Sequence, residues 1–125
     1  MQGAGDYLNQ AEEDLNIAKV KIKNKEYEWV ITRAQLCIIN AFKALIEYKG
    51  VHHRSNTIPG LLNELAATCD IPTEVCQAVN AVSNKTPMPS ERICRFITLQ
   101  AEMVLGWVSN TMGYQNQDDI GGFRI

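Results

Sequence analysis

The stretch YEWVITRAQLCIINAFKALIEY, residues 27–48, decides the fold. At about 100° per residue its polar side chains gather in one narrow sector, and apolar side chains fill almost all of the rest. This pattern predicts a helix that must be covered on several sides. Gly50 follows in a position suited to a left-handed C-cap, so the helix ends there. The stretch therefore predicts the core helix of an all-α domain.

Apolar residues also recur at steps of three and four on both sides of this stretch. Residues 6–24 predict one amphipathic helix with a narrow buried stripe, and residues 58–69 predict another that Thr57 and Pro59 begin. A short helix is expected after Asp70-Ile71-Pro72. The chain should thus be helical on both sides of its most apolar segment.

Residues 91–112 predict a long last helix that begins at a Ser90 N-cap and ends before Gly113. Its apolar arc is wide and leaves only a thin strip for water, formed by Arg95, Thr98, Glu102 and Ser109. Two helices with such wide arcs exceed what their neighbours can cover, which predicts a homodimer or a tight partner. Residues 1–113 are expected to form the domain and residues 114–125 a flexible tail.

Composition limits the class of protein. The 125 residues suit one domain, and 46% apolar with 21% charged residues is typical of a folded chain. Twelve basic against fourteen acidic residues give a net charge of −2, without the basic excess of a dedicated nucleic-acid binder. No secretory leader or uninterrupted apolar span is visible, which predicts a cytoplasmic protein with no membrane contact. Its cysteines should be reduced and mostly buried: Cys37, Cys69, Cys76 and Cys94.

No phosphate-binding loop, HExxH, GxSxG or EF-hand pattern occurs, and no cofactor is expected. The cluster His52-His53-Arg54 lies in a predicted loop, where it could bind phosphate or supply a general base. The alternative is an ordinary solvated loop. A metal site is not expected, because adjacent histidines rarely converge on one ion and no third ligand has a suitable spacing.

Three polar residues of the core helix, Arg33, Asn40 and Lys43, share one face. They could form a ligand-facing stripe in a groove, or they could simply meet water, with Lys43 paired to Glu47. Both alternatives stay open at this point.

Arg92 and Arg95 fall in the first turns of the last helix, where a cation opposes the helix dipole. Contact with phosphate is one reason for their presence. Solvation, or pairing with Glu91 or Glu102, is the other.

The segment YLNQAEEDLNIA, residues 7–18, is followed by a turn that contains Tyr27. Next come RAQ at 33–35, AFKALI at 41–46 and Gly50, and LLNEL follows at 61–65. Together these segments resemble HEPN domains, whose loose signature combines an "A..DL..A" helix with an "AQ…A..KALL…G" helix. The resemblance covers most of residues 6–112.

This resemblance implies an up-down four-helix bundle, here with an extra short helix, and commonly a dimer. Many HEPN domains are encoded beside a minimal nucleotidyltransferase, as toxin and antitoxin. Active members carry an Arg-x(4–6)-His motif near the start of the last long helix and cleave RNA without metal. Here the nearest arginine before His52 is Arg33, nineteen residues upstream, and no histidine follows Arg92 or Arg95. No catalytic residue is therefore carried over.

The leading hypothesis is a non-catalytic, dimeric HEPN binding module for a nucleotide, RNA or a nucleotidyltransferase partner. One alternative is a metal-independent ribonuclease that uses His52 or His53. The other is a purely structural dimerisation protein.

Overall fold

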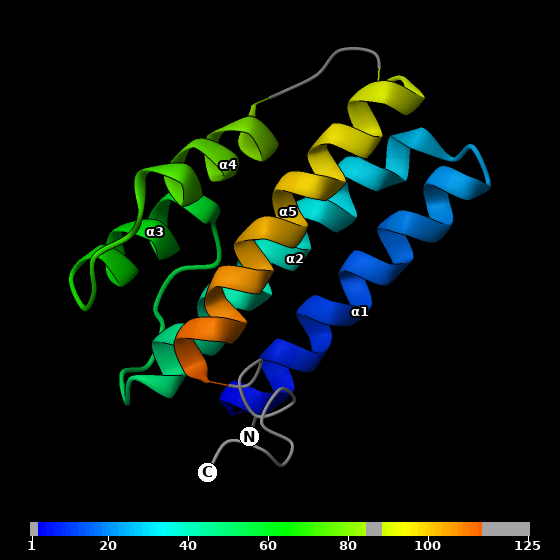
Figure 1. Cartoon of the computed structure of the whole chain (residues 1–125). Helices are drawn as coiled ribbons and strands as arrows, with labels where there is room; N and C mark the ends of the chain where they lie inside the picture. Colours follow the sequence, from blue (N-terminus) through cyan, green and yellow to red (C-terminus); the bar gives the residue numbers. More distant parts are fainter. Residues whose placement is uncertain (1–2, 85–88, 114–125) are drawn as a thin grey trace, which may run out of the picture.

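The computed structural model describes residues 3–84 and 89–113, and Figure 1 shows its helices. Five helices lie in these residues: α1 (Ala4–Lys23), α2 (Tyr27–Tyr48), α3 (Ile58–Ala66), α4 (Thr73–Ser83) and α5 (Glu91–Met112). Their order in space follows an up-down bundle, in which α1, α2, α4 and α5 alternate in direction and α3 is the extra short helix. The all-α prediction is confirmed. The predicted tail, residues 114–125, lies outside the described residues.

Helix α2 is the core of the bundle, as its sequence predicts. The other four helices all contact it, and its buried residues include Phe42, Leu45 and Ile46. By length and composition α2 could also cross a membrane, yet half of its most apolar 18 residues are buried inside the bundle. Burial against other helices accounts for this apolar composition.

The predicted helix ends are confirmed by their caps. The Thr57 hydroxyl accepts a hydrogen bond from the Gly60 N–H at 3.2 Å, and the Ser90 hydroxyl accepts one from the Ile93 N–H at 3.2 Å. Both hydroxyls satisfy N–H groups that have no partner within their helix. Gly50 and Gly113 follow α2 and α5 with φ of +84° and +85°, a conformation that favours glycine.

The cysteines lie largely where the sequence places them. Cys37 and Cys94 are fully buried, Cys69 and Cys76 are partly exposed, and all four are free thiols. Burial raises the pKa of Cys37 to about 12 and also raises the pKa of Cys94. Both thiols are therefore un-ionised and shielded, which makes them poor nucleophiles.

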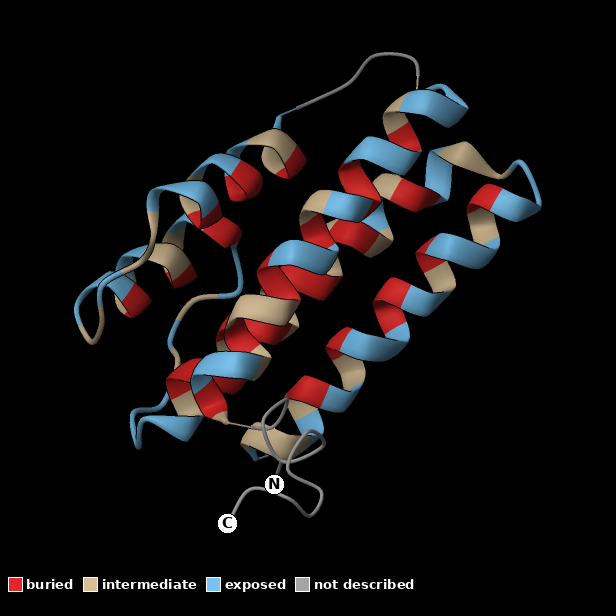
Figure 2. Cartoon of the chain, in the orientation of Figure 1, coloured by how far each residue is buried: buried red, intermediate tan, exposed pale blue. Residues whose placement is uncertain are grey.

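The outward face of α5 differs from the sequence prediction. Thr98, expected to face water, is only 4% exposed, and its hydroxyl has no hydrogen-bond partner in the described residues. Phe96, Leu99 and Met103, expected in the apolar arc, are 52%, 61% and 39% exposed. The reason is that α1 and α4 flank α5, so the neighbours decide which part of a wide arc is buried (Figure 2). The face between α1 and α4 is left uncovered.

Candidate functional site

Helices α1 and α2 are joined by a buried carboxylate, that of Asp14, which is 1% exposed. Its oxygens accept hydrogen bonds from Arg33 Nη1 at 3.0 Å, Asn40 Nδ2 at 2.9 Å and Gln10 Nε2 at 3.3 Å. Arg33 and Asn40 therefore both donate to this carboxylate, while the Arg33 side chain stays 38% exposed. They neutralise and solvate the buried charge of Asp14, which holds the two helices together.

Asp14 is a buried polar residue that was not predicted, although the sequence carries a signal for it. Ala11, Asp14, Leu15 and Ala18 are spaced like one buried helix face. A carboxylate in that stripe must find donors in a neighbouring helix.

Lys43 lies at the other end of the same face of α2. Its Nζ sits 5.8 Å from the centre of the Tyr7 ring, a cation–π distance. The Tyr7 ring in turn meets the His53 ring edge to face at 5.3 Å. The alternative pairing of Lys43 with Glu47 does not occur among the ion pairs of residues 3–84, because Glu47 turns toward the following loop.

Glu47 organises the histidines at the end of α2. Its carboxylate lies 3.3 Å from His52 Nδ1 and 2.9 Å from His53 Nδ1, and it accepts a hydrogen bond from the His53 backbone N–H at 3.1 Å. Burial opposes ionisation of Glu47, but the bonds from His53 and His52 outweigh it and hold the pKa of Glu47 below its ordinary value. We call Glu47, His52 and His53 the histidine end of the bundle.

The histidine end has a defined chemistry. A carboxylate can only accept hydrogen bonds, so each imidazole that bonds to it carries its proton on Nδ1. The side chain of His52 is 85% exposed and that of His53 is 18% exposed, so His52 is the more open to a ligand.

Arg54 is positioned by its backbone. The Arg54 and Ser55 N–H groups donate to the two oxygens of Glu64, each at 2.8 Å, and the bond from Arg54 is the main cause of a lowered Glu64 pKa. Arg54 lines an open groove of about 390 Å³ with Val51, His52, Glu64 of α3 and two residues just after that helix, Ala67 and Thr68. Arg54 and His52 are thus brought together as the sequence suggests.

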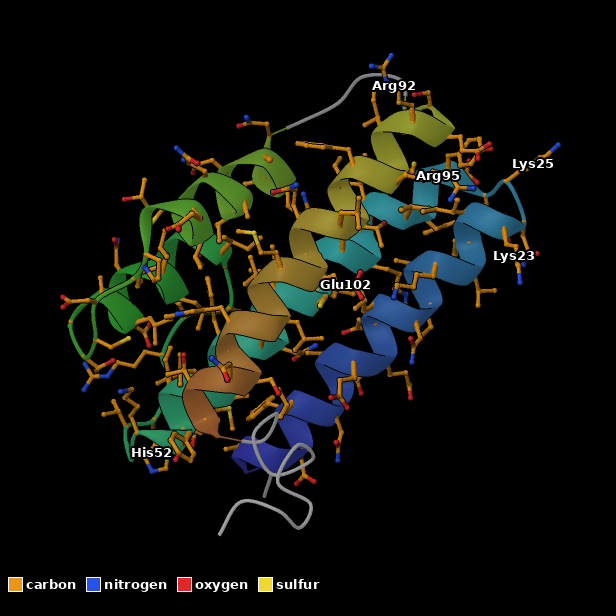
Figure 3. All side chains as sticks on the ribbon, in the orientation of Figure 1. Lys23, Lys25, His52, Arg92, Arg95 and Glu102 are labelled. Carbon is orange, nitrogen blue, oxygen red and sulfur yellow. The ribbon has the colours of Figure 1, made fainter. Side chains whose placement is uncertain are left out.

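The arginines of α5 lie at the opposite end of the bundle (Figure 3). Arg95 binds Glu91 through Nε at 2.8 Å and Nη2 at 2.7 Å, which is the pairing expected as one alternative. Arg95, with the Tyr27 hydroxyl, lowers the pKa of Glu91. Arg92 is exposed and makes no ion pair within the described part of the chain.

Two lysines from the turn between α1 and α2 share this end. Lys23 and Lys25 are exposed and have no ion pair in the part of the chain that the structure covers, whereas Lys21 binds Glu26 at 3.4 Å. We call Lys23, Lys25 and Arg92 the basic end. Basic residues in the last turn of α1 interact favourably with the helix dipole, and the up-down topology also places them at the same end of the bundle as Arg92 (Figure 3).

The two ends lie far apart. Helix α2 has 22 residues and begins beside the start of α5, where the Cys94 thiol contacts the Tyr27 carbonyl oxygen at 3.7 Å. At 1.5 Å per residue it separates the ends by roughly 30 Å. His52 and Arg92 therefore cannot act on one phosphate within one chain. In residues 3–84 and 89–113 no group of three potential ligand side chains could hold a metal ion.

Comparison with known proteins gives a consistent picture. The profile of the HEPN domain matches residues 4–86. A protein of Methanocaldococcus jannaschii named "Putative toxin MJ1304" is 30% identical over 59 residues, which are 47% of this chain and only 39% of that protein.

Two solved structures share the fold. ST0689, an archaeal HEPN homologue, superposes with a TM-score of 0.76 over 90% of this chain and 99% of its own, at 23% identity. The HEPN domain protein TM0613 of Thermotoga maritima gives 0.77 over 86% and 97%, at 20% identity. At these identities the likeness is one of fold alone.

Proposed function

The chain belongs to the HEPN domain family, and on that premise we propose that it is a non-catalytic module that binds the phosphates of a nucleotide or RNA at its basic end. The observation that carries this proposal is that Lys23, at the end of α1, Lys25, just after it, and Arg92, in the first turn of α5, all lie at one end of the bundle (Figure 3). All three side chains are exposed and without an ion pair in residues 3–84 and 89–113. Cations in this state can bind phosphate without first breaking another pair.

The overall charge of the chain does not favour a polyanion. Because the chain carries a net charge of −2, phosphate binding must depend on a local group of cations such as the basic end. Arg95 is excluded from it, because both of its contacts go to Glu91. Three phosphate contacts give weak binding that falls steeply with salt.

Cleavage is not part of the proposal. The family mechanism requires a histidine beside the arginine, and the two histidines lie at the other end of α2, roughly 30 Å away. A phosphate bound at the basic end is therefore too far from His52 and His53 of the same chain to react with them.

The test is binding of a fluorescent RNA oligonucleotide and of ATP to three variants. Arg92→Gln and Lys23→Gln should each weaken RNA binding several-fold at low salt and lower the slope of log K against log salt by about 1. Lys49→Gln is the matched control, since it removes an exposed lysine beyond the far end of α2. Equal losses in all three variants, or none, would refute the proposed site.

A second candidate is a metal-independent ribonuclease at the histidine end. It is favoured by one specific observation, the orientation of both imidazoles by Glu47 at 3.3 and 2.9 Å. Cleavage of RNA in EDTA that disappears in the His52→Ala, His53→Ala double variant would establish it. The first proposal predicts intact RNA for the wild type as well.

We further propose that the module pairs with a nucleotidyltransferase, as HEPN toxins do. Membership of the family and the name of the relative from M. jannaschii support this, although that match spans 39% of the relative. Co-expression with a minimal nucleotidyltransferase encoded beside this chain should give a stable complex. If neither phosphate nor such a partner binds, the remaining hypothesis is a purely structural dimerisation protein.

A further inference from the structure

A groove between α1 and α5 opens toward the basic end. Its volume is about 370 Å³, within the range of small-molecule sites, and its walls are Lys19 and Ile22 of α1 with Arg95, Thr98, Leu99 and Glu102 of α5. Lys23 follows Lys19 by four residues, so the two share one face of α1. Arg92 precedes Arg95 by three residues and lies beyond it at the start of α5 (Figure 3). A ligand in the groove can therefore reach the cations of the basic end.

The most buried residue of this groove is polar. Thr98 is 4% exposed, and its hydroxyl has no hydrogen-bond partner in residues 3–84 and 89–113. A buried hydroxyl without a partner is unfavourable, and such groups are uncommon in folded proteins. A polar atom of a ligand bound in the groove would supply the missing partner.

An ion pair bridges the groove and offers a donor beside an acceptor. Glu102 Oε2 accepts a hydrogen bond from Lys19 Nζ at 3.1 Å, whereas Glu102 Oε1 accepts none within the described part of the chain. The carboxylate can only accept and the ammonium can only donate. Both side chains are 47% exposed, so the polar edge of a ligand can reach them.

The remaining wall is apolar. Ile22 is buried, and Leu99 of α5 is 61% exposed. A flat ring can lie against these side chains while its polar edge meets Lys19 and Glu102. Flat apolar faces with a polar edge are the features by which proteins recognise an unstacked nucleobase.

On the premise that the basic end holds phosphate, we infer that this groove binds the base of the same nucleotide and selects guanine. Guanine presents two neighbouring donors, N1–H and the N2 amino group, beside an acceptor, O6. Glu102 accepts from the two donors, Lys19 donates to O6, and the Thr98 hydroxyl bonds to another polar atom of the nucleotide. Adenine and cytosine have no ring N–H beside their amino group, and uracil has no amino group. The groove thus supplies the base specificity that contacts to phosphate do not provide.

A pair of matched nucleotides tests the role of Glu102. Inosine 5′-monophosphate (IMP) differs from guanosine 5′-monophosphate (GMP) only in lacking the N2 amino group. In NMR titrations at low salt, GMP should bind the wild type roughly tenfold more tightly than IMP, and ribose 5-phosphate more weakly than either. Glu102→Gln should weaken GMP about tenfold, remove most of the difference between GMP and IMP, and leave ribose 5-phosphate unchanged. Glu13→Gln, at an exposed carboxylate of α1 outside the groove, is the control and should bind all three ligands as the wild type does.

Thr98→Val tests the buried hydroxyl, because valine keeps the shape of threonine. Removing an unsatisfied polar group should raise the melting temperature, yet the same change should weaken GMP binding several-fold. A threonine with a purely structural role would change the melting temperature alone.

The outcomes separate this inference from the phosphate proposal. Equal affinities for GMP, IMP and ribose 5-phosphate, all lowered by Arg92→Gln, would overturn the base site and leave the phosphate site standing. Binding of guanosine as tight as that of GMP, with no effect of Arg92→Gln, would overturn the phosphate site and support the groove alone. No binding of any of these ligands at millimolar concentration would overturn both.

Two sources of the base are distinguished by a further titration with a short uridine oligonucleotide, with and without one guanosine. A preference for the guanosine-containing strand that is lost in Glu102→Gln identifies the ligand as single-stranded RNA. A preference seen with GMP but not with the strand identifies it as a free nucleotide.

Discussion

Asp14 makes the most consequential single contact in the bundle. It is almost fully buried, and Arg33, Asn40 and Gln10 donate to it. Asp14→Ala leaves these donors without an acceptor, so we expect the free energy of unfolding to fall by about 2–3 kcal/mol, discounted because the Arg33 side chain is 38% exposed. Urea unfolding at pH 7 measures it.

Glu13→Ala is the control for this change, since Glu13 is the exposed neighbour of Asp14 on the same helix. It should alter stability by no more than about 0.5 kcal/mol. Equal effects of the two substitutions would show that the polar contacts between α1 and α2 contribute nothing.

Glu47 couples stability to pH. Burial opposes its charge, but hydrogen bonds from His53 and His52 lower its pKa in the folded state. Because the folded pKa lies below the unfolded one, this stabilisation is present above about pH 4.3 and is lost as the pH falls through the folded value. Glu47→Gln should therefore cost about 1 kcal/mol at pH 7 and much less near pH 3.

Urea unfolding of wild type and Glu47→Gln at both pH values measures the difference. Glu12→Gln, which changes an exposed carboxylate of α1, is the control. Its effect on the free energy of unfolding should be the same at pH 3 and at pH 7. If Glu47→Gln lowers the free energy of unfolding as much at pH 3 as at pH 7, the histidines do not stabilise the charged form of Glu47.

At the level of a single helix, the first turn of α3 requires Gly60 because a larger residue would clash with Ser55. A Cβ at Gly60 would come within 2.7 Å of Ser55 Cβ, so Gly60→Ala should destabilise the fold although alanine is normally better in a helix by about 1 kcal/mol. Combining it with Ser55→Gly removes the clash and should recover much of the loss. Thermal unfolding followed by circular dichroism compares the wild type with these two variants. If Gly60→Ala raises the melting temperature, the loop does not pack on α3 as described.

The helix ends were predictable because caps are local. Thr57, Ser90, Gly50 and Gly113 are read from one or two neighbouring residues, and the structure places all four as expected. The outward face of α5 was not predictable from the sequence. A wide apolar arc does not show which of its sides is buried, because that depends on where α1 and α4 pack. Thr98 was therefore predicted to face water, but it is buried.

For the whole molecule, the sequence predicted the all-α fold and the family, but it did not predict which distant residues lie together at each end of the bundle. Apolar periodicity predicted an all-α bundle around α2, and the HEPN profile over residues 4–86 agrees with the resemblance. His52 and Arg54 line one groove because they are two residues apart in the same loop. The partners of Asp14 and the location of Lys25 at the same end of the bundle as Arg92 depend on how distant segments pack, which local spacing does not encode.

Binding of phosphate at the basic end of this HEPN domain, without cleavage of RNA, can be measured in a single gel-shift experiment. A 5′-labelled single-stranded RNA is incubated with the purified chain in EDTA at low salt, and bound fraction and RNA length are read from the same reaction. We predict RNA that is retarded and full-length, with retardation lost in the Arg92→Gln, Lys23→Gln double variant. RNA that is shortened, or that migrates as free RNA at every protein concentration, would contradict the account.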